Sequence, residues 1–216
     1  EATTTAPGET AELRFQATYP GAYIYHCAVP NMDMHISAGM FGIILVEPPE
    51  GLPEVDHEIY IGQHELYTSK PAGEEGHHQF DMESMTSEEP SYVLMNGEKY
   101  ALTPNVYGPA VTTGLDETVR VFFVDGGPNL ASSFHPIGSV WEKLYPGGSL
   151  STDPQTHIQT RQVAPGSTTV ATMNSPVPGD FKLVDHSLSR VARKGCMAIV
   201  RAEGEERPEI FDPEPA

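Results

Sequence analysis

One pattern of small and turn-forming residues occurs twice in this chain of 216 residues, near its beginning and again near its end. The matching stretches are residues 6–8 and 164–166, 20–21 and 178–179, and, after a two-residue deletion, 39–43 and 195–199. Self-similarity at one constant spacing indicates two homologous domains in tandem. The chain is therefore limited to folds in which one such unit can be built twice.

Short β-like runs separated by turn residues fill both copies. The 20 prolines and 20 glycines interrupt these runs, and no long segment has helical periodicity. Asn96-Gly97 is a hairpin signal between two of the runs. The sequence therefore predicts an all-β fold. Among the predicted strands are residues 12–17, 59–61, 92–95 and 119–124.

The repeat also predicts the domain boundaries. Residues 48–56 form a proline-rich linker, residues 57–204 a complete domain, and residues 205–216 a tail. Residues 1–47 correspond only to the last part of the complete copy, so we expect roughly the first two thirds of the first domain to lie in a separate chain or a missing piece.

A possible metal site follows the strand-like run of residues 22–25. His26 and Cys27 end this run, and His35 and Met40 come after them. Thiolate, imidazole and thioether are the ligands of a blue-copper electron-transfer site. Successive side chains of a strand point to opposite faces, so His26 and Cys27 cannot easily bind the same ion. The sequence therefore suggests two coppers.

The charge of the chain excludes some partners. Lys and Arg number 12 against 30 Asp and Glu, a net charge of −18, so nucleic acid is an unfavourable partner. Dispersed acid with few lysines is typical of a halophilic surface, but also of an ordinary acidic secreted protein. No apolar run approaches the roughly 18 residues needed to span a membrane, and no signal peptide is visible at the N-terminus.

Cys27 and Cys196 are the only cysteines, and in an oxidising compartment they could pair. The repeat argues against a disulfide, because Cys196 occupies the position of Met40 in the sister domain. We therefore expect two unpaired thiols, with Cys196 in the core. The second copy has Val184 and Asp185 near the position of Cys27, so we expect no blue copper there.

Residues 20–28, together with His35, Met40 and their neighbouring glycines, resemble the copper-containing nitrite reductases. The second domain agrees at residues 126–130, 134–138 and 183–187, and the short loop from Cys27 to His35 is similar to that of the outer-membrane enzymes of some pathogens. The resemblance covers nearly the whole chain. It implies tandem cupredoxin-like Greek-key domains, a homotrimer, and the reduction of nitrite to nitric oxide and water in denitrification or nitrate respiration.

The resemblance also implies a role for each candidate residue. The ligands would be Cys27, His35 and Met40 for a type 1 copper, and His26 and His186 of a neighbouring subunit for a type 2 copper. One further histidine for each copper, and a catalytic aspartate, would come from the missing segment. His135 would act in the pocket as a proton donor, and Ile137 would wall it. An extracytoplasmic location, and a small cupredoxin or c-type cytochrome as electron donor, are implied as well.

Two other functions are compatible with parts of the pattern. A laccase-like multicopper oxidase needs His-x-His motifs and a His-Cys-His run, whereas Cys27 is followed by Ala28 and no His-x-His occurs. A non-enzymatic electron carrier would keep the three type 1 ligands but would have no use for His26, His135 and His186 together. Four other histidines are expected to be surface or outer-shell residues without a visible partner, namely His57, His64, His77 and His78, and His157 is left without a role.

Overall fold

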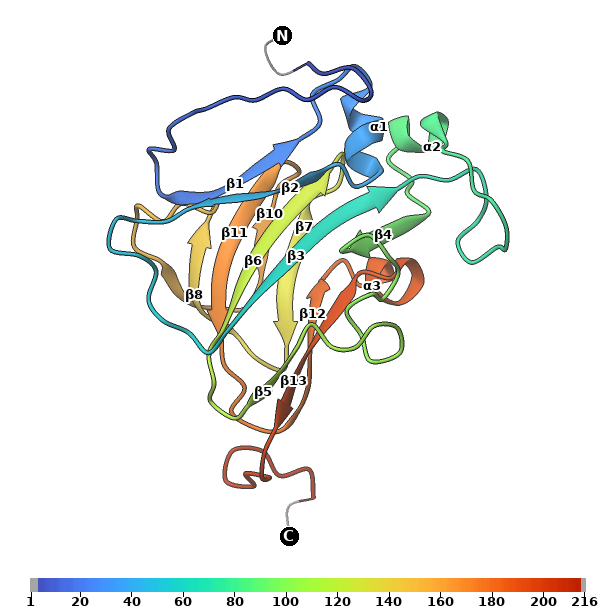
Figure 1. Ribbon diagram of the computed structural model, residues 1–216. Coiled ribbons are helices and arrows are strands. Elements are labelled where there is room, and N and C mark those ends of the chain that lie inside the picture. The colour runs from blue at the N-terminus through green and yellow to red at the C-terminus, as the bar shows by residue number, and fades with distance from the viewer. Residues whose placement is uncertain (1–3, 215–216) are drawn as a thin grey trace.

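The computed structural model describes residues 4–214. Two sheets face each other in a sandwich, and a smaller sheet lies against one of them (Figure 1). The six-stranded sheet has the spatial order β4 (Tyr92–Met95), β3 (His57–Leu66), β6 (Val119–Gly127), β11 (Ser167–Met173), β8 (Trp141–Pro146) and β9 (Gln155–Ile158). The five-stranded sheet has the order β10 (Arg161–Val163), β7 (Ser132–Ile137), β12 (Gly179–Asp185), β13 (Met197–Glu203) and β5 (Val111–Gly114). The predicted all-β class is confirmed.

The smaller sheet consists of β1 (Gly21–His26) and β2 (Phe41–Val46), which pair in the antiparallel sense. The short helix α1 (Met32–Ser37) joins them. The other helices are also short, namely α2 (Met82–Thr86) and α3 (Ser189–Lys194). Within residues 4–214 no helix is long and apolar enough to cross a membrane.

The main core lies between the two large sheets. The Phe134 ring of β7 stacks on Phe123 of β6 with ring centroids 3.9 Å apart, and on Trp141 of β8 at 4.8 Å. All three side chains are fully buried. Because neighbouring residues of a strand point to opposite faces, a Phe134 that faces the core leaves His135 on the outer face of the five-stranded sheet.

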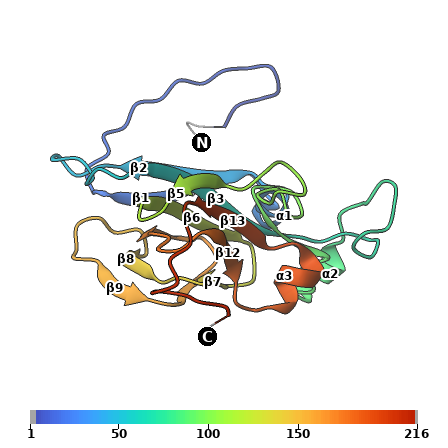
Figure 2. The same cartoon turned by 90° about the horizontal axis from the view of Figure 1, so that it is seen from below.

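The smaller sheet covers the outer face of the six-stranded sheet, which is why β6 is buried on both sides (Figure 2). At one end, the Ala22 N–H donates to the Gly148 carbonyl at 2.8 Å, and Thr168 Oγ1 donates to the Ala22 carbonyl at 2.6 Å. At the other end, the Phe41 ring packs so closely on Gly126 that a Cβ there would lie 2.8 Å from it. A hydrogen-bonded end and an aromatic end thus fix the smaller sheet in place.

The internal repeat is visible as two strand–helix–strand units. β1, α1 and β2 form one unit, and β12, α3 and β13 form the other, each with its two strands paired in the antiparallel sense. Met40 and Cys196 each stand just before the second strand of their unit. Cys27 and Cys196 are both free, and Cys196 is fully buried, so the expectation of two unpaired thiols is confirmed.

Two local predictions were wrong. Residues 12–17 are not a strand but part of an exposed segment that runs outside the sheets (Figure 1), with Leu13 and Phe15 exposed. A strand needs a neighbour for its backbone hydrogen bonds, and none pairs with this segment among the described residues. Asn96-Gly97 does form a turn with both residues at positive φ, but the run after it continues as turns instead of a second strand.

The predicted linker, residues 48–56, contains no helix or strand, and β3 begins directly after it at His57. After β13, the described part of the tail, residues 205–214, has no helix or strand either. The division into domains remains a prediction. Residues 1–3 of the predicted first domain and 215–216 of the predicted tail lie outside the described residues.

Candidate functional site

Cys27, His35 and Met40 are brought together by the turn through α1. Cys27 Sγ lies 3.3 Å from His35 Nδ1. The Cys27 N–H donates to the Met40 carbonyl, and the Met40 N–H donates to the His35 carbonyl, both at 3.0 Å. Backbone hydrogen bonds therefore hold the three residues next to one another, although they come from a strand end, a helix and a loop.

The distance between the Cys27 sulfur and the His35 nitrogen suits one shared metal ion. With metal–sulfur and metal–nitrogen bonds of about 2.3 and 2.0 Å, two ligands of a tetrahedral ion lie about 3.5 Å apart. The observed 3.3 Å is close to this value. Thiolate and imidazole donors favour copper or zinc over hard cations. The residues present thus fit a copper ion.

The chain folds this way locally because two residues with left-handed backbones bound α1. Asn31, before the helix, has φ 67°, and Gly39, after it, has φ 93°. Helical side chains point back toward the N-terminus of their helix. A histidine in the last turn of so short a helix can therefore return to the end of β1, where Cys27 stands.

His26 is exposed, whereas Cys27 beside it is half-buried. The His26 Nδ1 lies 2.8 Å from the Cys27 carbonyl oxygen. A carbonyl can only accept, so Nδ1 carries the proton, and Nε2 of the neutral ring is free to bind a metal. His26, Met32 and Pro165 are among the residues that line a hollow of about 620 Å³.

His135 and His186 form a second group, on the outer side of the five-stranded sheet. Their ring centroids lie 4.8 Å apart, and the rings meet edge to face at 82°. His135 is 7% exposed, and its Nδ1 lies 2.9 Å from the Gln159 carbonyl and 3.0 Å from Thr160 Oγ1. Nδ1 therefore donates, and Nε2 is left free. Burial lowers the pKa of His135; the bond to Gln159 opposes this, and the His186 ring adds to it.

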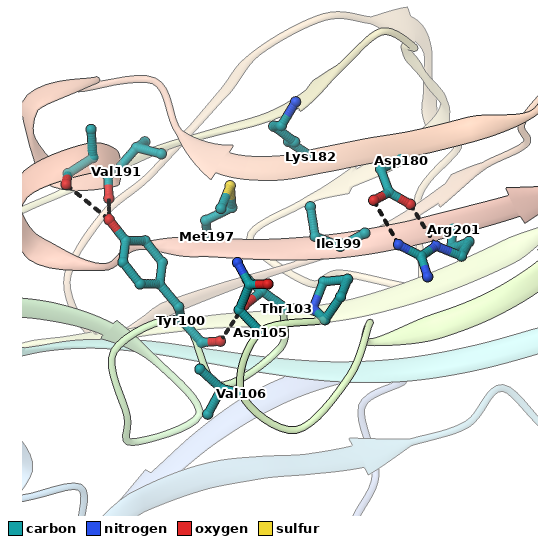
Figure 3. Close-up of a pocket in the computed structure, with 12 residues that line it drawn as sticks. Tyr100, Thr103, Asn105, Val106, Asp180, Lys182, Val191, Met197, Ile199 and Arg201 are labelled. Atoms are coloured by element: carbon teal, nitrogen blue, oxygen red, sulfur yellow. Dashed lines mark hydrogen bonds and ion pairs between the residues drawn. The ribbon is translucent and has the colours of Figure 1, made fainter.

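Ile137 stands two residues after His135 on the same side of β7 and is partly exposed. It therefore lies where a wall of a pocket at His135 would be. On the same outer face, over β12 and β13, is a hollow of about 700 Å³. Tyr100, which donates to carbonyls of α3, lies at one end, and the Asp180–Arg201 ion pair at the other (Figure 3). The predicted site residues do not line it.

Asp185 fixes the backbone around both histidines. Its carboxylate is fully buried, and its Oδ1 accepts from the Ser133 and Ser187 N–H groups, each at 3.0 Å. Its Oδ2 receives a bond from Arg190 at 2.5 Å. The His186 N–H donates to the Ser133 carbonyl at 2.8 Å. The turn that carries His186 is thus tied to the strand that carries His135.

Two buried carboxylates, those of Glu65 and Asp125, were not identified in the sequence analysis. Glu65 accepts from the Asn129 and Leu130 N–H groups, and Asp125 accepts from those of Gly127 and Ser132, so the two carboxylates hold the loop that leads into β7. Burial raises the pKa of both. No sequence signal marked them, because β3 also contains Glu58 and Gln63, and β6 also contains Arg120.

Three of the five unassigned histidines do have partners. His57 pairs with Glu117 at 2.9 Å, and His78 contacts Thr68 and the Glu74 carbonyl. His64 is buried, not at the surface, and contacts the end of α1. His77 and His157 are exposed.

The structure does not gather all the predicted ligands at one place. Among the described residues, no group of three or more His, Cys, Asp or Glu side chains could hold a metal ion, and no contact joins His26 to His135 or His186.

This chain is similar to a protein family model and to curated and solved proteins that contain copper. The family model of multicopper oxidases matches residues 1–50. The copper-containing nitrite reductases of Neisseria meningitidis serogroup B and Neisseria gonorrhoeae are each 44% identical over 97% of this chain, which covers 53% and 52% of their lengths. The chain thus spans about half the length of the curated relatives it matches.

A solved copper nitrite reductase from Nitrosomonas europaea superposes with a TM-score of 0.81 at 32% identity. The match covers 94% of this chain and 70% of that one. The resemblance found in the sequence is confirmed: the chain belongs to the copper-containing nitrite reductase family.

Proposed function

We propose that the complete protein reduces nitrite by one electron to nitric oxide and water. The observation that carries this proposal is the contact of 3.3 Å between Cys27 Sγ and His35 Nδ1, one peptide bond away from a histidine with a free Nε2. A single backbone link would thus connect an electron-transfer site and a catalytic site. Bound copper would supply a one-electron centre at the first site and a Lewis acid for nitrite at the second.

Cys27, His35 and Met40 are proposed to hold the type 1 copper, with one histidine from outside this chain. Their arrangement supports this, since the sulfur and nitrogen donors already face each other at a suitable distance. Residues 1–47 would then be the last part of one cupredoxin domain, and residues 57–204 would be a second.

His26 and His186 are proposed to hold the type 2 copper together with a histidine from outside this chain. The two residues make no contact within the described chain, so they would meet between subunits of a homotrimer. The outer face of the five-stranded sheet carries the His135–His186 pair and a hollow of about 700 Å³, so we place the subunit contact there.

His135 is proposed to deliver one of the two protons that the reaction consumes. Gln159 and Thr160 orient the ring through Nδ1, which leaves Nε2 to face the substrate. The lowered pKa of His135 favours the neutral ring near pH 7, so the proton would be held only briefly and passed on easily. Ile137 would close the same side of the pocket and exclude water.

Location and partners are proposals of the same kind. We expect an extracytoplasmic protein that receives electrons from a small cupredoxin or a c-type cytochrome. The net charge of −18 supports work in high salt, where self-repulsion is screened. Raising the potassium chloride concentration should then increase the melting temperature of the protein, whereas no increase would favour an ordinary acidic secreted protein.

The test is the substitution His186→Ala in the copper-loaded, full-length protein. The blue absorption should remain, while the type 2 paramagnetic-resonance signal disappears and nitrite turnover falls by more than the roughly 10–100-fold expected for an outer-shell partner. His157→Ala, at an exposed histidine in β9, is the matched control. If turnover survives in His186→Ala with an unchanged blue colour, the role of His186 is wrong.

The same spectra decide between this proposal and an electron carrier. A carrier would show the type 1 copper alone and no turnover of nitrite. If the copper-loaded protein has no blue absorption, both the nitrite reductase and the electron carrier are excluded.

A further inference from the structure

The end of α1 is hydrogen-bonded to β3 through Ser37. Ser37 lies between the proposed ligands His35 and Met40 and is fully buried. Its Oγ donates to the Glu65 carbonyl at 2.8 Å. Its own carbonyl lies 2.8 Å from Nδ1 of His64. Ser37 therefore makes two hydrogen bonds to β3, one through its side chain and one through its backbone.

His64 has one nitrogen bonded and one unbonded, and both are buried. The side chain is 4% exposed, and within the described chain its Nε2 has no hydrogen-bond partner. The Ser37 carbonyl can only accept, so the proton sits on Nδ1. Leaving Nε2 without a partner in the interior has a free-energy cost. A fully apolar side chain would avoid that cost but could not hold Ser37, so the bond from Nδ1 is the evident use of this histidine.

Phe41 holds the other end of the same loop. It follows Met40 directly, and its ring meets the His64 ring at 62° with centroids 5.6 Å apart. A Cβ on Gly62 would lie 3.2 Å from the Phe41 ring, and one on Gly126 2.8 Å. The ring thus sits in a notch that only glycines leave open. His64 thus contacts Ser37 inside the segment from His35 to Met40 and Phe41 directly after it.

The hydrogen bonds within this segment are otherwise local. The Ala38 N–H donates to the Met34 carbonyl, Gly39 to Ile36, and Met40 to His35. They fix the shape of the loop, and the bond from the Cys27 N–H to the Met40 carbonyl ties its end to β1. The position of the loop on β3 depends on Ser37 and Phe41.

We propose that His64 is a positioning residue of the type 1 site: through the Ser37 carbonyl and the Phe41 ring, it sets where His35 and Met40 stand relative to Cys27. The inference rests on the proposed function, because it assumes copper at these three residues. Outer-shell groups that hold a ligand in place tune both the affinity and the electronic properties of a metal site. A residue of the predicted second domain would then control a copper bound by the first.

The test compares His64→Leu with His64→Asn in the copper-loaded, full-length protein. The Asn amide nitrogen can take the place of Nδ1 and donate to Ser37, whereas Leu cannot. His64→Leu should lower the affinity of the blue site for copper by about 10-fold, change the ratio of its visible bands and shift its reduction potential. In His64→Asn, the copper affinity, the band ratio and the reduction potential should stay close to those of the parent protein. His57→Leu, on the same strand and paired with Glu117, is the control that should change none of them.

Two results would overturn the inference. One is a folded His64→Leu protein with an unchanged affinity and spectrum. The other is an equal change in His64→Leu and His64→Asn, which would mean that ring packing matters and the hydrogen bond does not. If His64→Leu does not fold, His64→Gln decides, since the longer Gln side chain places its amide near the position of Nε2 and not of Nδ1, and so loses the bond to the Ser37 carbonyl: a spectral shift supports the inference, and no shift overturns it. A parent protein without a blue band would contradict the proposed function instead.

Discussion

The imidazole rings of His135 and His186 meet edge to face with their centroids 4.8 Å apart. They lie far apart in the sequence, and the sheet brings them together, because β7 and β12 are neighbouring strands in which His135 pairs with Val184. Behind them, the Asp185 carboxylate bonds to backbone groups on both sides. The contact between the two rings therefore depends on a buried charge.

Removing that charge should be costly. Asp185→Ala leaves the Arg190 guanidinium without its carboxylate partner and the N–H groups of Ser133 and Ser187 without their acceptor, so the free energy of unfolding should fall by about 3–5 kcal/mol. Denaturant unfolding measures this. Asp180→Ala breaks a matched but half-exposed pair with Arg201 and should cost under about 1 kcal/mol. Similar losses in the two variants would contradict the prediction.

Asp125 should make the protein less stable as the pH rises. Burial raises the pKa of Asp125 well above its usual value, and the nearby Glu65 carboxylate adds to the effect. The folded state then keeps a proton that the unfolded state releases above about pH 4, so the free energy of unfolding falls from that pH up toward the raised pKa. Asp125→Asn cannot titrate, and its stability should fall less steeply over this range.

The control for Asp125→Asn is Asp180→Asn, because the pKa of Asp180 is shifted in the opposite direction. The ion pair with Arg201 lowers the pKa of Asp180, so the stability that Asp180 contributes is lost only as the pH falls through that lowered pKa. Asp180→Asn should therefore alter the profile only on the acid side, below about pH 4. Parallel profiles for the parent protein and Asp125→Asn above pH 4 would mean that Asp125 is ionised in the folded state.

Gly148→Ala should loosen the smaller sheet. Gly148 has φ 68°, and a Cβ there would lie 2.1 Å from Thr168 Oγ1 and 2.5 Å from the Ala22 carbonyl oxygen. We expect a loss of about 1–3 kcal/mol and faster hydrogen exchange at the Ala22 amide. Gly147→Ala is the control, because Gly147 has a similar φ of 64° but nothing within 4 Å of its Cβ position. Equal losses would assign the effect to backbone strain alone.

The two thiols should differ in reactivity. Cys27 is half-buried, whereas Cys196 is fully buried, and burial raises the pKa of its thiol. In the copper-free, folded protein, an aromatic disulfide reagent should label Cys27 and leave Cys196 untouched until denaturant is added. Mass spectrometry of the labelled protein identifies the modified residue. Labelling of Cys196 at the rate of Cys27 under native conditions would show that the core opens there.

The parts of the fold that depend on residues close together in the sequence could be predicted from it. The strand before His26 and the return of His35 toward Cys27 are local, and both are present. The strand predicted at residues 12–17 failed, because alternation of side chains describes a strand but cannot supply its partner. The contact between His135 and His186 was not predicted, since the order of strands in a sheet is not written in local patterns.

Buried polar residues were the harder part of the site. Glu65, Asp125 and His64 resemble surface residues in composition, and the sequence alone gives no sign that loops and α1 cover them. Apart from the bond between Glu65 and the Tyr67 hydroxyl, the hydrogen bonds given for them above run to backbone groups, which look the same for every residue type. Only the three-dimensional arrangement reveals which carbonyl or N–H each of them faces.

The smaller sheet has a practical consequence for the production of residues 57–204, the predicted second domain, on their own. Val124 and Val170 are buried, yet they point away from the core between the large sheets, toward β1 and β2. A protein cut at the linker would leave this apolar surface open to solvent, and such patches promote aggregation. β1 and β2 thus also keep the sheet they cover from exposing apolar surface to solvent.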